Sequence, residues 1–264
     1  FGFAGFGYGK TIESLFRGVG AVMYFYDYFD LEWRALKGFK KPPAKINEPT
    51  SLGHFSNILG KAIGDFLVKK VYDVQVSIHY ESEMVLRQEV ISGSRPDLYC
   101  IGTNEQIAVE CKGSSRSSVS NADMTQYKNQ SAEGPLEVNR SVASATYNIY
   151  DELKNKFYDP VNPNASYNLE LNSSIFEDYY GIFVPLITAA SRVYRDRSNL
   201  ENVAVVEGVF PDFLPDYRIN LLLCTRIREC YQTGQVHRFQ GFDSLHPKET
   251  YIDSDGIGIG LVRK

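Results

Sequence analysis

Two acidic residues and a lysine occur in this sequence in an order that suits the hydrolysis of a phosphodiester. Asp97 follows Pro96, and the tripeptide Glu110-Cys111-Lys112 comes after an apolar stretch. Carboxylates are hard oxygen ligands of the kind that Mg²⁺ prefers. A bound cation polarises a phosphodiester and lowers the pKa of its water, and a neighbouring lysine positions that water or stabilises the charge developing on the phosphate. Asp97, Glu110 and Lys112 are therefore the candidate catalytic residues.

The elements that must position these residues are two strands joined by a turn. Apolar residues recur at alternate positions over residues 98–100 and again over residues 107–111, as expected of strands. The segment 102–105 between them, Gly-Thr-Asn-Glu, has the composition of a turn. The sequence therefore predicts a β-hairpin with the candidate residues near its open end.

The expected register of this hairpin brings the two acids together. A turn centred between Thr103 and Asn104 places Asp97 directly opposite Glu110, with their Cβ atoms roughly 5 Å apart. Side chains alternate along a strand, so Lys112 shares the face of Glu110. Two directly opposed carboxylates repel each other, which a purely structural hairpin would not favour. A divalent cation between them removes the repulsion.

Pro96-Asp97, followed after an apolar strand by Glu110-Cys111-Lys112, resembles the signature of the PD-(D/E)XK nuclease superfamily. That superfamily includes restriction endonucleases, recombination nucleases and repair nucleases. The resemblance implies a restriction endonuclease-like core, in which a mixed sheet is flanked by helices, and the use of Mg²⁺, for which Mn²⁺ can substitute. It implies that Asp97 and Glu110 bind the metal, that the backbone carbonyl of Cys111 is a further ligand, and that Lys112 assists catalysis.

The resemblance covers residues 51–131 and extends to the helix after the hairpin. A glutamine on that helix contributes to the site in some branches, which implies a catalytic role for Gln126, with Gln130 as the alternative. Many members also carry a metal-binding glutamate on the first helix. This chain departs from the pattern, because the helix predicted over residues 51–72 offers only Asp65, whose side chain is shorter.

The spacing of apolar residues predicts the remaining elements. Helices are expected over residues 12–38, 51–72, 121–131 and 147–157. Strands are expected over residues 74–80, 84–91, 180–188, 203–209, 219–225 and 257–262. Gly60 and Gly64 lie one turn apart in the second helix, where they allow another element to approach closely.

The mixture of helices and strands predicts an α/β fold. Residues 1–48 are expected to form an N-terminal helical arm, and residues 49–135 the nuclease core with the active site. Residues 136–264 form either the remainder of the same domain or a C-terminal α/β region for target recognition or dimerisation. Cutting a duplex often requires two active centres, so a homodimer is a candidate assembly.

Composition limits the classes of protein that fit. With 43% hydrophobic and 23% charged residues, the chain is of ordinary globular type. It has no apolar run long enough for a membrane span and no basic segment leading into an apolar one, so a cytoplasmic protein without a signal peptide is expected. The net charge of −4 argues against non-specific coating of nucleic acid, but DNA remains the expected partner of a local groove.

Other interpretations of the same residues stay open. A nuclease-like scaffold that binds nucleic acid or a protein without cutting is the main alternative to a DNA endonuclease of restriction or phage-defence type. Asp97 can also cap a turn, and Glu110 and Lys112 can form a solvated strand face. A third interpretation is a nucleotide-binding loop that ends in Lys10 and Thr11.

Overall fold

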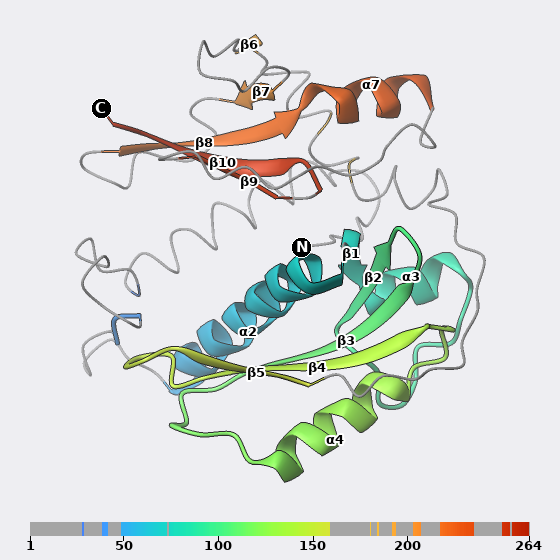
Figure 1. Ribbon diagram of the computed structural model, residues 1–264, viewed down its shortest axis with the longest axis vertical. Helices are drawn as coiled ribbons and strands as arrows, with labels where there is room; N and C mark the ends of the chain where they lie inside the picture. Colours follow the sequence, from blue (N-terminus) through green and yellow to red (C-terminus); the bar gives the residue numbers. More distant parts are fainter. Residues whose placement is uncertain are drawn as a thin grey trace. The chain divides into compact units, whose positions relative to one another are not determined.

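The computed structural model divides into two compact units, each considered by itself (Figure 1). It describes residues 28, 39–41, 49–72, 74–158, 180, 184, 192–193, 203–206, 217–234, 250–253 and 255–263. The described residues up to 158 belong to the first unit, which contains the candidate site, and those from 180 onward belong to the second.

The first unit is built on a mixed β-sheet. Its elements are α2 (Pro49–Tyr72), β1 (Val74–His79), α3 (Tyr80–Leu86), β2 (Leu98–Gly102), β3 (Gln106–Gly113), α4 (Asn121–Ala132), β4 (Arg140–Tyr147) and β5 (Lys154–Tyr158). The strand order is β1-β2-β3-β4-β5. Only β3 and β4 are parallel, and α4 lies between them in the chain. The α/β class, the helices over residues 51–72 and 121–131 and the strand over residues 74–80 are confirmed.

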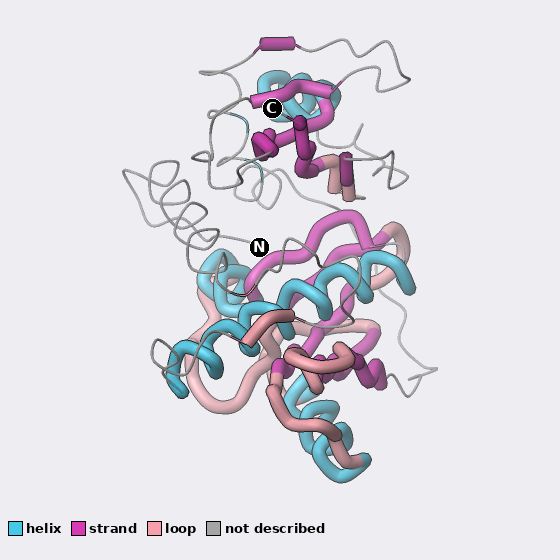
Figure 2. Tube along the Cα trace, turned by 90° about the vertical axis from the view of Figure 1, so that its left-hand side faces the viewer, coloured by secondary structure: helices cyan, strands magenta, loops and turns pink. Residues whose placement is uncertain are grey.

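Helices cover both faces of this sheet, and the alternation of side chains in β3 explains how. On one face, Val68 of α2 belongs to a buried cluster with Cys100, Ile107, Val109 and Cys111. On the other face, Met124 of α4 packs with Ala143 and Ala145 of β4. Figures 1 and 2 show α2 and α4 on either side of the strands. Glu110 and Lys112 alternate with the apolar residues of β3, so they belong to the α4 face.

Two glycines let α2 lie directly on the end of β3 that carries the candidate residues. A Cβ atom at Gly60 would lie 2.6 Å from the carbonyl carbon of Lys112, and one at Gly64 would lie 2.4 Å from Cys111 Sγ. A larger residue at Gly60 would require movement of the β3 backbone, and one at Gly64 would require movement of the Cys111 side chain. The predicted close approach at Gly60 and Gly64 is confirmed, and it is the contact that positions α2 over the site.

The strand predicted over residues 84–91 is wrong, because α3 occupies Tyr80–Leu86 and the chain then runs irregularly to β2. The apolar residues that indicated a strand, Val85, Val90 and Ile91, are exposed. They have no sheet face to cover, because β1 pairs directly with β2. The helix gains an ion pair between Glu83 and Arg87, at the spacing of one turn.

The helix predicted over residues 147–157 is also wrong. β4 runs to Tyr147 and pairs antiparallel with β5. Between them Asn148 has a φ of 54°, in the left-handed region that single Asn residues tolerate in turns, and its side chain donates to the Glu152 carbonyl at 2.9 Å. This turn prevents a continuous helix. β4 was not predicted, because its small residues show no apolar alternation and are buried on both faces.

The second unit contains an antiparallel sheet. Its described elements are β6 (Arg192–Val193), β7 (Val203–Val206), β8 (Tyr217–Cys224), α7 (Thr225–Thr233), β9 (Thr250–Ile252) and β10 (Ile257–Arg263), in the order β6-β7-β8-β10-β9. The predicted strands over residues 203–209, 219–225 and 257–262 are confirmed where the structure describes them, except at Thr225, which begins α7. The strand over residues 180–188 is wrong at its two described positions, which are helical.

Several predictions fall outside the described residues. The helices expected over residues 12–38 do so except at Tyr28, which lies in a turn, and so do Lys10 and Thr11 of the nucleotide-binding alternative. Within the described part of the chain, the helices lack the combination of length and apolar character that a membrane crossing needs.

Candidate active site

The hairpin of β2 and β3 has the register that the sequence predicts. Leu98 pairs with Val109, and Ile101 pairs with Gln106, so the turn is centred between Thr103 and Asn104. The ladder ends at Leu98, and the N–H of Asp97 donates to the carbonyl of Val109 at 3.0 Å. Asp97 therefore lies at the open end of the hairpin, one residue before β2. The predicted direct pairing of Asp97 with Glu110 is not part of the ladder, because the Asp97 side chain turns out of it.

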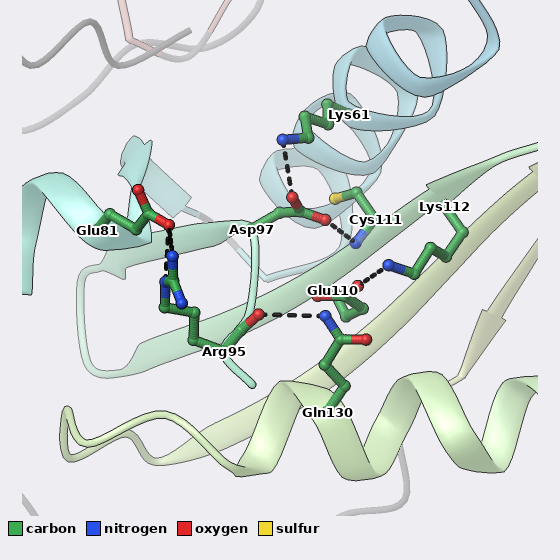
Figure 3. Close-up of polar contacts among 8 residues, drawn as sticks. All are labelled: Lys61, Glu81, Arg95, Asp97, Glu110, Cys111, Lys112 and Gln130. Carbon is green, nitrogen blue, oxygen red and sulfur yellow. Dashed lines mark hydrogen bonds and ion pairs between the residues drawn. The ribbon is translucent and has the colours of Figure 1, made fainter. Parts of the chain in front are cut away.

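The Asp97 carboxylate joins three elements (Figure 3). Its Oδ2 accepts a hydrogen bond from the backbone N–H of Cys111 in β3 at 3.0 Å. Its Oδ1 lies 2.8 Å from Nζ of Lys61, which reaches down from α2. The Asp97 side chain remains 18% exposed, so the group is accessible to solvent and to a small cation.

Glu110 is the most unusual group of the site, because its side chain is 0% exposed. Oε1 contacts Lys112 Nζ, while no described donor hydrogen-bonds to Oε2. Burial and, second, the negative charge of Asp97 raise the pKa of Glu110 to about 7, although Lys112 and Lys61 act in the opposite direction. The surroundings of Glu110 therefore supply less positive charge than its ionised form needs.

Lys112 lies on the same face of β3 as Glu110, as predicted. Burial lowers its pKa, but the hydrogen bond and attraction to Glu110 more than offset this, and the pKa lies above the ordinary value. Lys112 is therefore a protonated donor at neutral pH. Its Nζ lies 5.7 Å from the ring centre of Tyr127 on α4, and its side chain keeps 38% exposure, so the ammonium group is accessible to solvent.

The structure treats the two glutamines of α4 differently. Ser120 and Asp123 form a capping box that fixes the start of this helix. Gln126 is exposed on its surface. Gln130 is half-buried, and its Nε2 donates to the carbonyl of Arg95 at 3.2 Å, close to Glu110 in Figure 3. The alternative glutamine, not Gln126, thus contacts the segment that leads into Asp97.

Asp65, the acid of the first helix, is not brought to the site. Its Oδ1 contacts Ser77 Oγ of β1, and its Oδ2 lies 3.2 Å from Nζ of Lys69, one turn further along α2. In place of an acid, α2 presents Lys61 to the site. Lys61 was not predicted from the sequence, although its position next to Gly60 marks it as a neighbour of the contact with β3.

An ion pair between Arg95 and Glu81, also not predicted, fixes the segment that leads into Asp97. Arg95 Nε donates to Glu81 Oε1 of α3 at 2.7 Å, and Arg95 Nη1 donates to the carbonyl of Gly93 at 2.8 Å. Together with Gln130, these bonds hold the chain on both sides of Arg95. The two residues before Asp97 are therefore fixed by α3 and α4.

The available donors suit a hard cation. Asp97 and Glu110 supply carboxylate oxygens. Cys111, which lies between Glu110 and Lys112 in the sequence, supplies a backbone carbonyl. Mg²⁺ is commonly held by one or two carboxylates and keeps several waters. Among the described residues, no group of three or more His, Cys, Asp or Glu side chains is arranged to hold a metal. The Cys111 thiol is buried beside Gly64 with a raised pKa, so it is not a ligand.

Taken together, the open end of the β2–β3 hairpin carries a buried acid with one oxygen that accepts no described hydrogen bond, a more exposed acid and a protonated lysine. These groups can bind a divalent cation and the phosphate of a substrate. Comparisons of this chain with protein-family models, with curated proteins and with solved structures find no match. Function is therefore inferred from the residues of the site.

Proposed function

We propose that this protein is a Mg²⁺-dependent nuclease that hydrolyses phosphodiester bonds, with Asp97, Glu110 and Lys112 at its active centre. The observation that carries the proposal is the buried carboxylate of Glu110, which has one oxygen without a donor. The five-stranded mixed sheet between helices supports a restriction endonuclease-like core of the PD-(D/E)XK type.

A purely structural role accounts poorly for Glu110. Removing a carboxylate from water costs several kcal/mol unless hydrogen bonds and a counter-charge replace the solvent. Lys112 supplies one contact and is itself partly exposed. An apolar residue at position 110 would pack against α4 without that cost. A bound divalent cation, by contrast, would use both the charge and the free oxygen.

The chain's own residues divide the chemistry between them. Asp97, Glu110 and the Cys111 carbonyl would hold Mg²⁺, which when bound polarises the phosphodiester and acidifies its water. Lys112 keeps its proton at Nζ and donates to the phosphate oxygens, where negative charge develops. Gln130 and Arg95 act one step away, because their contacts fix the backbone from which Asp97 projects.

The substrate that we propose is DNA, cut internally in a restriction or phage-defence setting, by a homodimer where both strands are cut. This part rests on the resemblance of the Asp97 and Glu110-Cys111-Lys112 motif. Because such motifs are reused on many substrates, the preference between DNA and RNA belongs in the test below.

One observation favours the alternative of a non-cutting binding module. Each acid of the site already has an ammonium partner, since Lys61 pairs with Asp97 and Lys112 pairs with Glu110. A protein with this arrangement can hold its carboxylates without a metal. Binding of nucleic acid that is equal with Mg²⁺ and with EDTA, and that is never followed by cleavage, would identify this function.

Cleavage of supercoiled plasmid, linear DNA and a single-stranded RNA tests the proposal. The wild type should cut with Mg²⁺ or Mn²⁺ and not with EDTA. Lys112→Ala should cut on the order of 10²–10³-fold more slowly, as expected when one transition-state donor is lost. Lys70→Ala removes the same charge from the exposed end of α2 and should cut normally. Equal rates for wild type and Lys112→Ala would overturn the assignment of the site.

A further inference from the structure

Lys61 pairs with one of the two carboxylates that would hold a cation. Its Nζ lies 2.8 Å from Oδ1 of Asp97, and the other oxygen of that carboxylate is taken by the N–H of Cys111. Figure 3 shows Lys61 reaching from α2 toward the carboxylate, on the side away from Glu110 and Gln130. An ammonium so placed neutralises Asp97 and shields one of its two oxygens.

The contact is not needed to hold α2 in place. Gly60 and Gly64 set the helix against the backbone and side chains of β3, and Val68 anchors it in the buried cluster. Lys61 adjoins Gly60, so its backbone is fixed by that packing. Its flexible side chain is 27% exposed, so Nζ can leave Asp97 and be solvated while the helix stays where it is.

We propose, resting on the nuclease function above, that Lys61 is a built-in competitor of the divalent cation at Asp97. In the metal-free protein it supplies the positive charge that the acid needs. A cation that takes Asp97 must first displace the ammonium, and it then has the displaced positive charge as a neighbour. Lys61 therefore sets a threshold concentration of the cation. Below that concentration, the ammonium group of Lys61 remains paired with Asp97 and the metal does not bind.

Among the described residues, the other charged groups around Asp97 do not replace this effect. Arg95 is engaged by Glu81 and by the carbonyl of Gly93, and Lys112 pairs with Glu110. His79, at the end of β1, has its pKa lowered by burial and then by Lys61, although Glu81 and Asp97 raise it. Lys61 is thus the group whose removal frees Asp97 while leaving the other pairs intact.

Calorimetric titration of Mn²⁺ into the full chain, without DNA, tests the proposal. A partly exposed ion pair is worth up to about a factor of five in an equilibrium constant, and the repulsion of the displaced ammonium adds to it. Lys61→Met should therefore bind Mn²⁺ about threefold to tenfold more tightly than wild type. Lys61→Arg should bind as wild type does, because it keeps a cation at Asp97.

The controls separate competition from net charge and from the metal site itself. Lys70→Met removes one positive charge from the same helix and should leave the affinity near the wild-type value. Asp97→Asn should abolish binding in both the wild-type and the Lys61→Met background. Circular dichroism tests whether each variant folds. If Lys61→Met does not fold, Lys61→Gln serves as the neutral variant in its place.

The outcomes distinguish this inference from the function on which it rests. Tighter binding in Lys61→Met, lost again with Asp97→Asn, supports it, and so does binding that is measurable only in Lys61→Met. Equal affinities in wild type and the neutral Lys61 variants would overturn the competition while leaving the metal site standing. Absence of binding in all folded variants would overturn the metal site and the nuclease proposal together.

Discussion

The two halves of the site use the same pair of charges in different ways. On β3, Glu110 and Lys112 are two positions apart on one strand, and the acid is 0% exposed. In the other half, Asp97 immediately precedes β2 and its side chain is 18% exposed, while Lys61 lies on α2 and its side chain is 27% exposed. The first pair is dictated by strand alternation, and the second by how α2 packs. In the proposed nuclease, Glu110 and Lys112 would provide the driving force for cation binding, and Asp97 and Lys61 would control access.

The packing of α2 against β3, which brings Lys61 to Asp97, should be disrupted most strongly by a substitution at Gly60. In Gly60→Ala the added Cβ would meet the backbone of Lys112 and Gly113 at 2.6 Å, so we expect a loss of more than about 3 kcal/mol in the free energy of unfolding. Gly53→Ala, on the same helix with nothing within 4 Å, should gain up to about 1 kcal/mol from helix propensity. Urea unfolding followed by circular dichroism compares them, and equal effects would contradict the packing.

The Glu110→Gln variant tests the buried half of the site, which consists of Glu110 and Lys112. Because the folded-state pKa of Glu110 is raised from 4.5 to about 7, this group favours folding fully below pH 4.5, and that stability is lost as the pH rises through 7. At about 1.4 kcal/mol for each pKa unit, the wild type should lose roughly 3 kcal/mol across this window. Glu110→Gln should lack this loss and should also fail to cleave DNA.

The measurement is the free energy of unfolding between pH 4.5 and pH 8 in EDTA, for wild type and for Glu110→Gln. Glu89→Gln, a change at an exposed position after α3, should keep the wild-type pH dependence. Parallel curves for wild type and Glu110→Gln would show that ionisation of Glu110 does not lower the stability of the folded protein.

The smallest expected effect separates the two glutamines of α4. Gln130→Ala removes the hydrogen bond to the carbonyl of Arg95, which should cost about 1 kcal/mol of stability and about tenfold in cleavage rate through a looser Asp97. Gln126→Ala, at an exposed position, should change neither. A larger effect at Gln126 would restore the assignment that the sequence motif favours.

The half of the site on β3 could be predicted from the sequence because it depends on local rules. Alternation places Glu110 and Lys112 on one face, and the turn at Thr103-Asn104 sets the register of the hairpin. The spacing of Gly60 and Gly64 indicated a close contact between this helix and another element. These features follow from strand geometry and from the small size of glycine, and neither depends on distant parts of the chain.

The rest depends on tertiary structure, which no local pattern encodes. Lys61 looks like an ordinary surface lysine until α2 is placed over the open end of the hairpin. Gln126 and Gln130 are equivalent in sequence, and only the path of the Arg95 backbone selects Gln130. The strand β4 was missed because its buried positions are filled by small residues such as Ala143 and Ala145, which fit closely between two covered faces and show no apolar alternation.

The location of a bound cation tests the central claim most directly. Crystals of the protein soaked in Mn²⁺ would show the metal by its anomalous scattering. We expect a peak that contacts the carboxylate oxygens of Asp97 and Glu110 and the carbonyl of Cys111, with Lys61 Nζ moved away from Asp97. At saturating Mn²⁺, a site without a peak, in which Lys61 is still paired with Asp97, would contradict it.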